Sequence, residues 1–187
     1  TKKNKKNTPI FRFSKQVSNY TNPQNQQLID HLKQTNLLPS ILFYFSREKV
    51  ESKARQLANA SSVSEYKNIV KKQFDHIFSD LENEEYSLLN LDEHLWMWSR
   101  GVGFHHAGLA PIVKEFVEYL FLNKYIDYLY ATETLALGIN MPAKSIILER
   151  LYKYDGVKTR LITQSEFLQL TGRAGRRGID DKGYAFL

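Results

Sequence analysis

The sequence contains no cysteine among its 187 residues. Disulfide scaffolds, thiolate metal sites and cysteine nucleophiles are therefore excluded, and a reducing, intracellular compartment is expected, either cytoplasm or nucleus. No apolar run approaches the roughly 18–20 residues that cross a bilayer, so a membrane protein is not expected. Hydrophobic residues make up 42% of the chain and charged residues 25%, a composition typical of one globular domain.

Acidic residues are scarce at the start of the chain. Residues 1–33 carry a net charge of +6, residues 34–128 a net charge of −3, and residues 129–187 a net charge of +3. Basic ends around an acidic middle favour a polyanionic partner, although the lysine-rich stretch 2–6 by itself is more typical of a solvated, disordered tail. We expect residues 1–22 to form a flexible N-terminal segment and 23–187 to form the domain, since Asn22-Pro23 marks a boundary.

An initiating methionine is also lacking, and the chain stops inside the apolar run 184–187. We therefore interpret the sequence as a piece of a longer protein.

Short apolar runs alternate with helical patterns along most of the chain. A helical, acidic stretch is expected as an insertion at about 60–98, and a turn is expected at Asp155-Gly156. Strands alternating with helices predict an α/β fold with a mainly parallel central sheet flanked by helices. The expected strands cover residues 41–45, 101–106, 126–130, 145–148 and 184–187.

The segment 169–180 reads Gln-Leu-Thr-Gly-Arg-Ala-Gly-Arg-Arg-Gly-Ile-Asp and carries the strongest functional signal. Its closely spaced glycines let the backbone approach a ligand. Arg173 and Arg176, three residues apart, can direct two forked guanidinium groups to one place, and such forks match phosphate oxygens. The alternative is a glycine-rich turn with solvated arginines.

This segment resembles motif VI of superfamily 2 helicases, Gln-x-x-Gly-Arg-x-Gly-Arg. Residues 43–47 resemble motif IV, 105–109 the helix-entry element that follows it, and 131–144 motif V, all in the family's order. Three motifs are similar to those of superkiller-type DExH-box helicases, which feed RNA to the exosome. They read His-His-Ala-Gly-Leu, Gly-Ile-Asn-Met-Pro-Ala and Gly-Arg-Ala-Gly-Arg-Arg-Gly-Ile-Asp. The similarity runs from about residue 38 to residue 187.

The resemblance implies a RecA-like three-layer sandwich that forms the second of two such domains. Arg173 and Arg176 would act as arginine fingers that reach the γ-phosphate of ATP held by the neighbouring domain. Gln169 would contact the nucleotide or position water, and Asn140 would face the ribose or the same cleft. The implied nucleotide-binding residues are Gln169, Gly172, Gly138 and Asn140.

Nucleic-acid contacts are expected at backbone phosphates rather than base edges. Ser46 and Arg47 lie at a strand end and a helix start, although Ser46 also suits a plain N-cap. Gly108 and Leu109 would present amides at a helix start near His106. The implied nucleic-acid-binding residues are Ser46, Arg47, His106, Gly108, Thr132 and Glu133.

The chain lacks a GxxxxGK[ST] loop and an acidic pair for Mg²⁺. The run 92–94, Asp-Glu-His, has the wrong order for a DExH box, and the adjacent His105 and His106 would point to opposite faces of a strand, so no metal site is expected. Trp96 and Trp98 are interpreted as core or domain-facing residues. ATP with Mg²⁺ would bind mainly to the missing first domain, and the isolated piece is expected to be inactive.

The sequence therefore predicts the C-terminal domain of an ATP-dependent RNA helicase. The expected partners are single-stranded RNA, the first RecA-like domain of the same protein and RNA-degradation machinery. Two alternatives stay open. One is a DNA helicase of the same superfamily, and the other is a non-catalytic, helicase-like scaffold.

Overall fold

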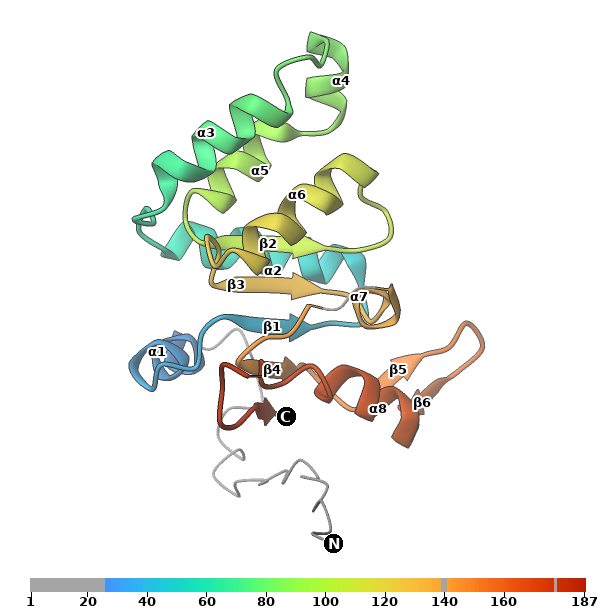
Figure 1. Ribbon diagram of the computed structural model, residues 1–187. Helices are drawn as coiled ribbons and strands as arrows, with labels where there is room; N and C mark the ends of the chain where they lie inside the picture. The colour runs from blue at the N-terminus through green and yellow to red at the C-terminus, as the bar shows by residue number, and fades with distance from the viewer. Residues whose placement is uncertain (1–25, 139–140, 177) are drawn as a thin grey trace, which may run out of the picture.

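A five-stranded sheet forms the centre of the computed structural model, which describes residues 26–138, 141–176 and 178–187 (Figure 1). The strand order is β2-β3-β1-β4-β7, and every neighbouring pair is parallel. The mainly parallel sheet that the sequence predicts is thus confirmed. The strands are β1 (Ser40–Phe43), β2 (Val102–His105), β3 (Tyr128–Ala131), β4 (Ser145–Leu148) and β7 (Tyr184–Phe186).

Helices cover both faces of this sheet. On one face lie α1 (Gln26–Gln34) and α2 (Arg47–Ala60), and on the other lies α6 (Pro111–Leu122). Helix α5 (Leu91–Trp98) packs against β2 at the edge of the sheet and contributes to both cores, and α3 (Lys67–Ile77) packs on α5. The remaining elements are α4 (Asn83–Leu88), α7 (Thr134–Gly138), α8 (Gln164–Thr171) and an antiparallel hairpin of β5 (Tyr152–Tyr154) and β6 (Thr159–Leu161). No helix within the described ranges is both long and apolar enough to cross a membrane.

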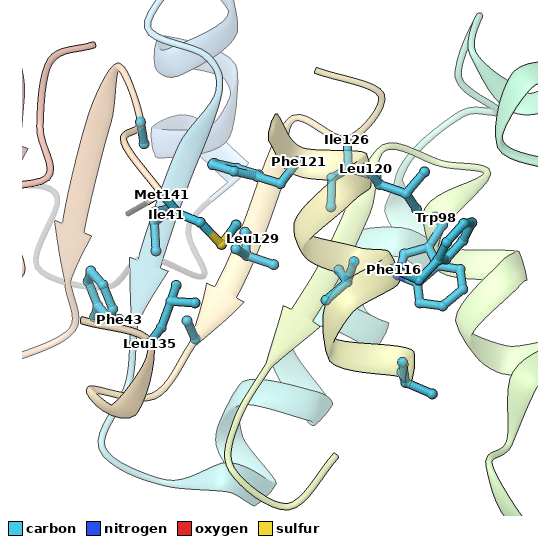
Figure 2. Packing of buried hydrophobic residues seen from close by; sticks show 14 of the residues in the cluster. Ile41, Phe43, Trp98, Phe116, Leu120, Phe121, Ile126, Leu129, Leu135 and Met141 are labelled. Carbon is cyan, nitrogen blue, oxygen red and sulfur yellow. The ribbon is translucent and has the colours of Figure 1, made fainter. Parts of the chain in front are cut away.

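The strands are buried on both faces because their side chains alternate. Ile41 and Phe43 of β1 join the core beneath α3, α5 and α6, whereas Leu42 joins the core beneath α1 and α2. Figure 2 shows the first of these cores, in which Trp98 packs beside Phe116 with ring centroids 5.0 Å apart. Two cores separated by one sheet make a three-layer α/β sandwich of the RecA-like kind, as the sequence predicts.

The structure confirms some predicted helices and adds one. As Pro111 predicts, helix α6 begins at that residue, because the fixed φ of proline suits the first helical position. Helix α7 was not expected, since a five-residue helix leaves too short a periodic pattern to detect. The stretch 60–98 contains α3, α4 and α5, as its helical pattern predicts. The expected N-terminal segment 1–22 lies outside the described residues.

His94 of α5 lies buried between aromatic rings and gives the fold a predictable response to acid. Its ring stacks on Trp98 at 5.0 Å and contacts Phe104 at 4.8 Å, and its Nδ1 has no hydrogen-bond partner among the described residues. Burial lowers the pKa of His94 from 6.5 to about 4. His94 is therefore protonated near pH 6.5 in the unfolded chain but only near pH 4 in the folded protein.

We expect the protein to lose up to about 3 kcal/mol of unfolding free energy through His94 as the pH falls from 6.5 towards 4. Above pH 6.5 this contribution should be complete. Denaturant unfolding at several pH values measures the slope, and His94→Phe, which keeps a ring but cannot titrate, should flatten it. Part of the slope should survive, because burial also lowers the pKa of His105 and His106. An unchanged slope in His94→Phe would contradict the assignment.

Candidate nucleotide and nucleic-acid interface

Three predicted nucleic-acid-binding segments meet at the carboxyl edge of the sheet. Phe43 of β1 pairs with Ala131 of β3, which pairs with His105 of β2, so the three strands end level with one another. Ser46, Thr132 and His106 follow these strand ends. In an open parallel sheet this edge is the usual place for ligand contacts.

Ser46 and Arg47 begin helix α2. The Oγ of Ser46 accepts a hydrogen bond from the backbone amide of Lys49 at 3.4 Å, which makes Ser46 the N-cap that the alternative interpretation describes. The side chain of Arg47 is exposed, and its guanidinium lies against Gly108, with Nη1 3.2 Å from the position that a Cβ on this glycine would take. Arg47 thus offers an accessible positive charge at the carboxyl edge.

His106 organises the turn that follows β2. Its Nε2 lies 3.0 Å from Oε1 of Glu51, and its Nδ1 accepts a hydrogen bond from the backbone amide of Gly108 at 3.1 Å. Because Nδ1 accepts, Nε2 must carry the proton and donate to Glu51. Burial lowers the pKa of His106, and Glu51 opposes this shift only in part.

The expected anion site at Gly108 and Leu109 stays a prediction, because both amides are engaged within the turn in this structure. The amide of Gly108 is bound by the His106 ring, and the amide of Leu109 donates to the His106 carbonyl at 3.2 Å. Both amides also precede α6, which begins at Pro111. Neither amide can therefore bind a phosphate while the turn keeps this shape, and His106 itself is only 4% exposed.

Thr132 and Glu133 follow β3 and are both engaged within the domain. The hydroxyl of Thr132 lies 2.8 Å from that of Thr134. The carboxylate of Glu133 binds Nζ of Lys153 at 2.7 Å, and Lys153 also binds Glu166 of α8 at 2.8 Å. Burial alone would lower the pKa of Lys153, but its hydrogen bonds with the two carboxylates raise it. The end of β3 is thus tied to the β5–β6 hairpin and to α8.

The glycine-rich segment after α8 is attached to the chain just before β4. The Ala143 amide donates to the Arg173 carbonyl at 3.0 Å, and the Gly175 amide donates to the Ala143 carbonyl at 2.8 Å. Gly175 has φ +89°, and a Cβ on it would lie 3.0 Å from the Gly183 nitrogen. Gly175 therefore serves a close crossing of two backbone segments, whereas the sequence suggested close approach to a ligand.

The two arginines of this segment bind different acceptors. Arg173 donates through Nη2 to the Ala136 carbonyl of α7, and burial lowers the pKa of its guanidinium. Arg176 binds Asp180 through Nε and Nη2, both at 2.7 Å, and donates its amide to the same carboxylate at 2.9 Å. Both guanidinium groups are held within this domain, which differs from the expectation that they point to one place. Their role as arginine fingers stays a prediction.

The other predicted nucleotide-binding residues are dispersed. Gln169 is exposed on α8, where it lines a shallow depression with Gln164, Ser165 and Leu168. Gly172 is the C-cap of α8, and Gly138 is the last residue of α7. Asn140 lies outside the described residues.

Sequence reasoning missed the carboxylates that hold the site together. Glu51 follows Arg47 by four residues on α2, which places both on one helix face, but this spacing does not indicate that Glu51 binds His106. Asp180 follows Arg176 by the same interval, but in a turn rather than a helix. Helical periodicity does not apply there, so only the structure identifies this pair.

Comparison with known proteins places the chain among helicases. It is 39% identical over 162 residues to the exosome RNA helicase MTR4 of Mus musculus, covering 86% of this chain and 16% of that protein. It is 38% identical over 180 residues to the probable helicase HelY of Mycobacterium tuberculosis, covering 95% of this chain and 20% of HelY. The chain belongs to the DExH-box helicases of superfamily 2.

Other relatives support the same placement. The DExH-box ATP-dependent RNA helicase DExH9 of Arabidopsis thaliana is 38% identical over 162 residues, again 86% of this chain and 16% of the relative. No family model matches the chain. The chain thus spans less than a quarter of each of these relatives, and its sandwich fits the C-terminal RecA-like helicase domain that the sequence predicts.

Proposed function

We propose that this domain is the second RecA-like lobe of an ATP-dependent RNA helicase, and that it contributes arginine side chains to ATP hydrolysis and phosphate contacts to single-stranded RNA. The observation that carries the proposal is the combination of DExH-box similarity with a RecA-like sheet whose carboxyl edge gathers Ser46, Arg47, His106 and Thr132. The names of the mouse and human relatives connect them with the exosome, and we extend this association to the whole protein.

The donor set of the glycine-rich segment suits a nucleotide phosphate. Arg176 keeps its fork charged at any working pH, and Asp180 occupies only its Nε–Nη2 edge. The side chain is 13% exposed, and Nη1 forms no hydrogen bond with the described residues. ATP, held with Mg²⁺ mainly by the first RecA-like lobe, supplies the phosphoryl group that is transferred to water. Arg176 would stabilise the negative charge that develops on the oxygens of that group.

The carboxyl edge suits a nucleic-acid backbone. Arg47 is an accessible cation of this edge, and the nearby carboxylates are bound to other groups: Glu51 to His106 and Arg55, and Glu149 to Lys49. A phosphate at the start of α2 would meet the Arg47 guanidinium together with the positive end of the helix dipole. Thr132, with its hydroxyl next to Thr134, borders the same edge.

Arg47→Ala in the full-length protein should weaken single-stranded RNA binding by roughly threefold to tenfold and reduce the dependence of log affinity on log salt by about one unit. The loss follows from the removal of one phosphate contact. Fluorescence anisotropy over a salt series measures both effects. Lys124→Ala, which removes an exposed charge from the turn after α6 at the opposite edge of the sheet, is the matched control.

Binding titrations with RNA and DNA, together with assays of ATP turnover, separate the alternative functions. Equal affinity for RNA and DNA, with ATP turnover stimulated mainly by DNA, would support the DNA-helicase alternative. Normal binding by Arg47→Ala would remove the carboxyl edge from the nucleic-acid site. A full-length protein that binds RNA without hydrolysing ATP would support the scaffold alternative.

A further inference from the structure

The Arg176–Asp180 pair is the most completely bonded ion pair in the described part of the chain. One carboxylate oxygen of Asp180 accepts from the Nε and the backbone amide of Arg176, and the other accepts from Nη2 at 2.7 Å. The Asp180 side chain is only 5% exposed and that of Arg176 13%. The Lys71–Asp75 pair, by contrast, leaves both side chains about half exposed.

The turn between the two residues is closed by backbone hydrogen bonds as well. The amides of Ile179 and Asp180 both donate to the Arg176 carbonyl, at 3.0 and 2.9 Å. Hydrogen bonding to the Arg176 side chain lowers the pKa of Asp180, so the carboxylate stays charged over the working pH range. The guanidinium therefore has one fixed orientation and little freedom to rotate.

The bonding pattern leaves the other edge of the fork open. Nε and Nη2 face Asp180, whereas Nη1 forms no hydrogen bond with the described residues. Since a guanidinium presents paired donors on two edges, the Nη1–Nη2 edge can still bind two oxygens of one phosphate. Restricting an arginine before it meets its target lowers the entropic cost of forming a bidentate contact.

From this geometry we infer that Asp180 is a positioning residue. It binds the Nε–Nη2 edge of the Arg176 guanidinium, so that the Nη1–Nη2 edge is presented to a phosphate across the domain boundary. The inference rests on the proposed function and adds a residue to it. Asp180 does not touch the phosphate; it acts only through Arg176.

A double-mutant cycle in the full-length protein tests the inference. The substitution Asp180→Asn keeps an oxygen for the Arg176 amide but puts an NH₂ group where the second carboxylate oxygen accepts from the guanidinium. It should lower kcat for RNA-stimulated ATP hydrolysis by roughly 10- to 100-fold, with KM for ATP within about threefold of the parent. In an Arg176→Ala background it should lower kcat no further. Single-turnover measurements with excess enzyme make the slow rates accessible.

The control substitution is Asp181→Asn, which removes the same charge from the exposed neighbouring residue and should leave kcat unchanged. Equal losses from Asp180→Asn in both backgrounds would show that Asp180 supports only the fold and would overturn the inference. An unchanged or increased kcat, or a loss confined to KM, would also overturn it. If Arg176→Ala alone keeps the parental rate, the proposed function itself fails, and that outcome is distinct from the others.

Discussion

Arg176→Ala in the full-length protein is expected to reduce ATP turnover by roughly 10³-fold or more, with a much smaller change in KM for ATP. The guanidinium is proposed to meet charge that develops only as the phosphoryl group transfers, so its loss should appear in kcat. A coupled assay of phosphate release at saturating RNA measures both constants.

A loss of kcat in Arg176→Ala reports on catalysis only if this variant still folds. Removing Arg176 leaves the 5%-exposed carboxylate of Asp180 without its partner, so some loss of stability is expected. Arg176→Lys keeps a positive charge beside Asp180 but cannot offer the planar fork, and it should lose roughly 100-fold in kcat with a nearly normal melting temperature. Arg150→Ala, at an exposed arginine paired loosely with Glu149 at 3.6 Å, should leave kcat intact. Near-parental turnover in both Arg176 variants would refute the proposed role.

Gly183→Ala should damage both the fold and the site. A Cβ on Gly183 would lie 2.2 Å from the carbonyl carbon and oxygen of Ala174 and 2.4 Å from the Gly175 nitrogen. These are backbone atoms, which cannot rotate away as a side chain would. We expect the unfolding free energy to fall by about 3 kcal/mol or more. We also expect kcat to fall by roughly 100-fold, since the displaced backbone lies between Arg173 and Arg176.

Denaturant unfolding and the phosphate-release assay measure the two effects of Gly183→Ala. Lys182→Ala introduces the same side chain at the exposed preceding residue and should change neither quantity appreciably. A stable Gly183→Ala protein with parental turnover would show that the backbone crossing can relax without consequence for the arginines.

Sequence patterns predicted the sheet because its strands are buried on both faces. Ser40–Phe43 and Ser145–Leu148 are continuous apolar or small-residue runs, which is how a parallel, helix-covered strand is recognised. The N-cap at Ser46 and the early proline of α6 were likewise readable, because capping depends on residues close in sequence. Local chemistry therefore sufficed for most of the fold.

The state of the candidate site could not be predicted in the same way. Whether Gly108 offers its amide depends on the orientation of the His106 ring, which Glu51 determines from 55 residues away. The role of Gly175 depends on Gly183, which crosses it in the folded chain. The motif alone predicted that Arg176 reaches a phosphate outside this domain. Its ion pair with Asp180 forms in a turn, which no periodic sequence pattern describes.

Arg176 is proposed to bind the transition state of phosphoryl transfer more tightly than the ground state. The most direct measurement is the affinity of the full-length protein for ADP with aluminium fluoride, compared with a non-hydrolysable ATP analogue, in the parent and in Arg176→Ala. We expect the substitution to weaken binding of the transition-state analogue by at least roughly 100-fold and binding of the ground-state analogue by less than about threefold. An equal effect on both affinities, or an effect on neither, would contradict it.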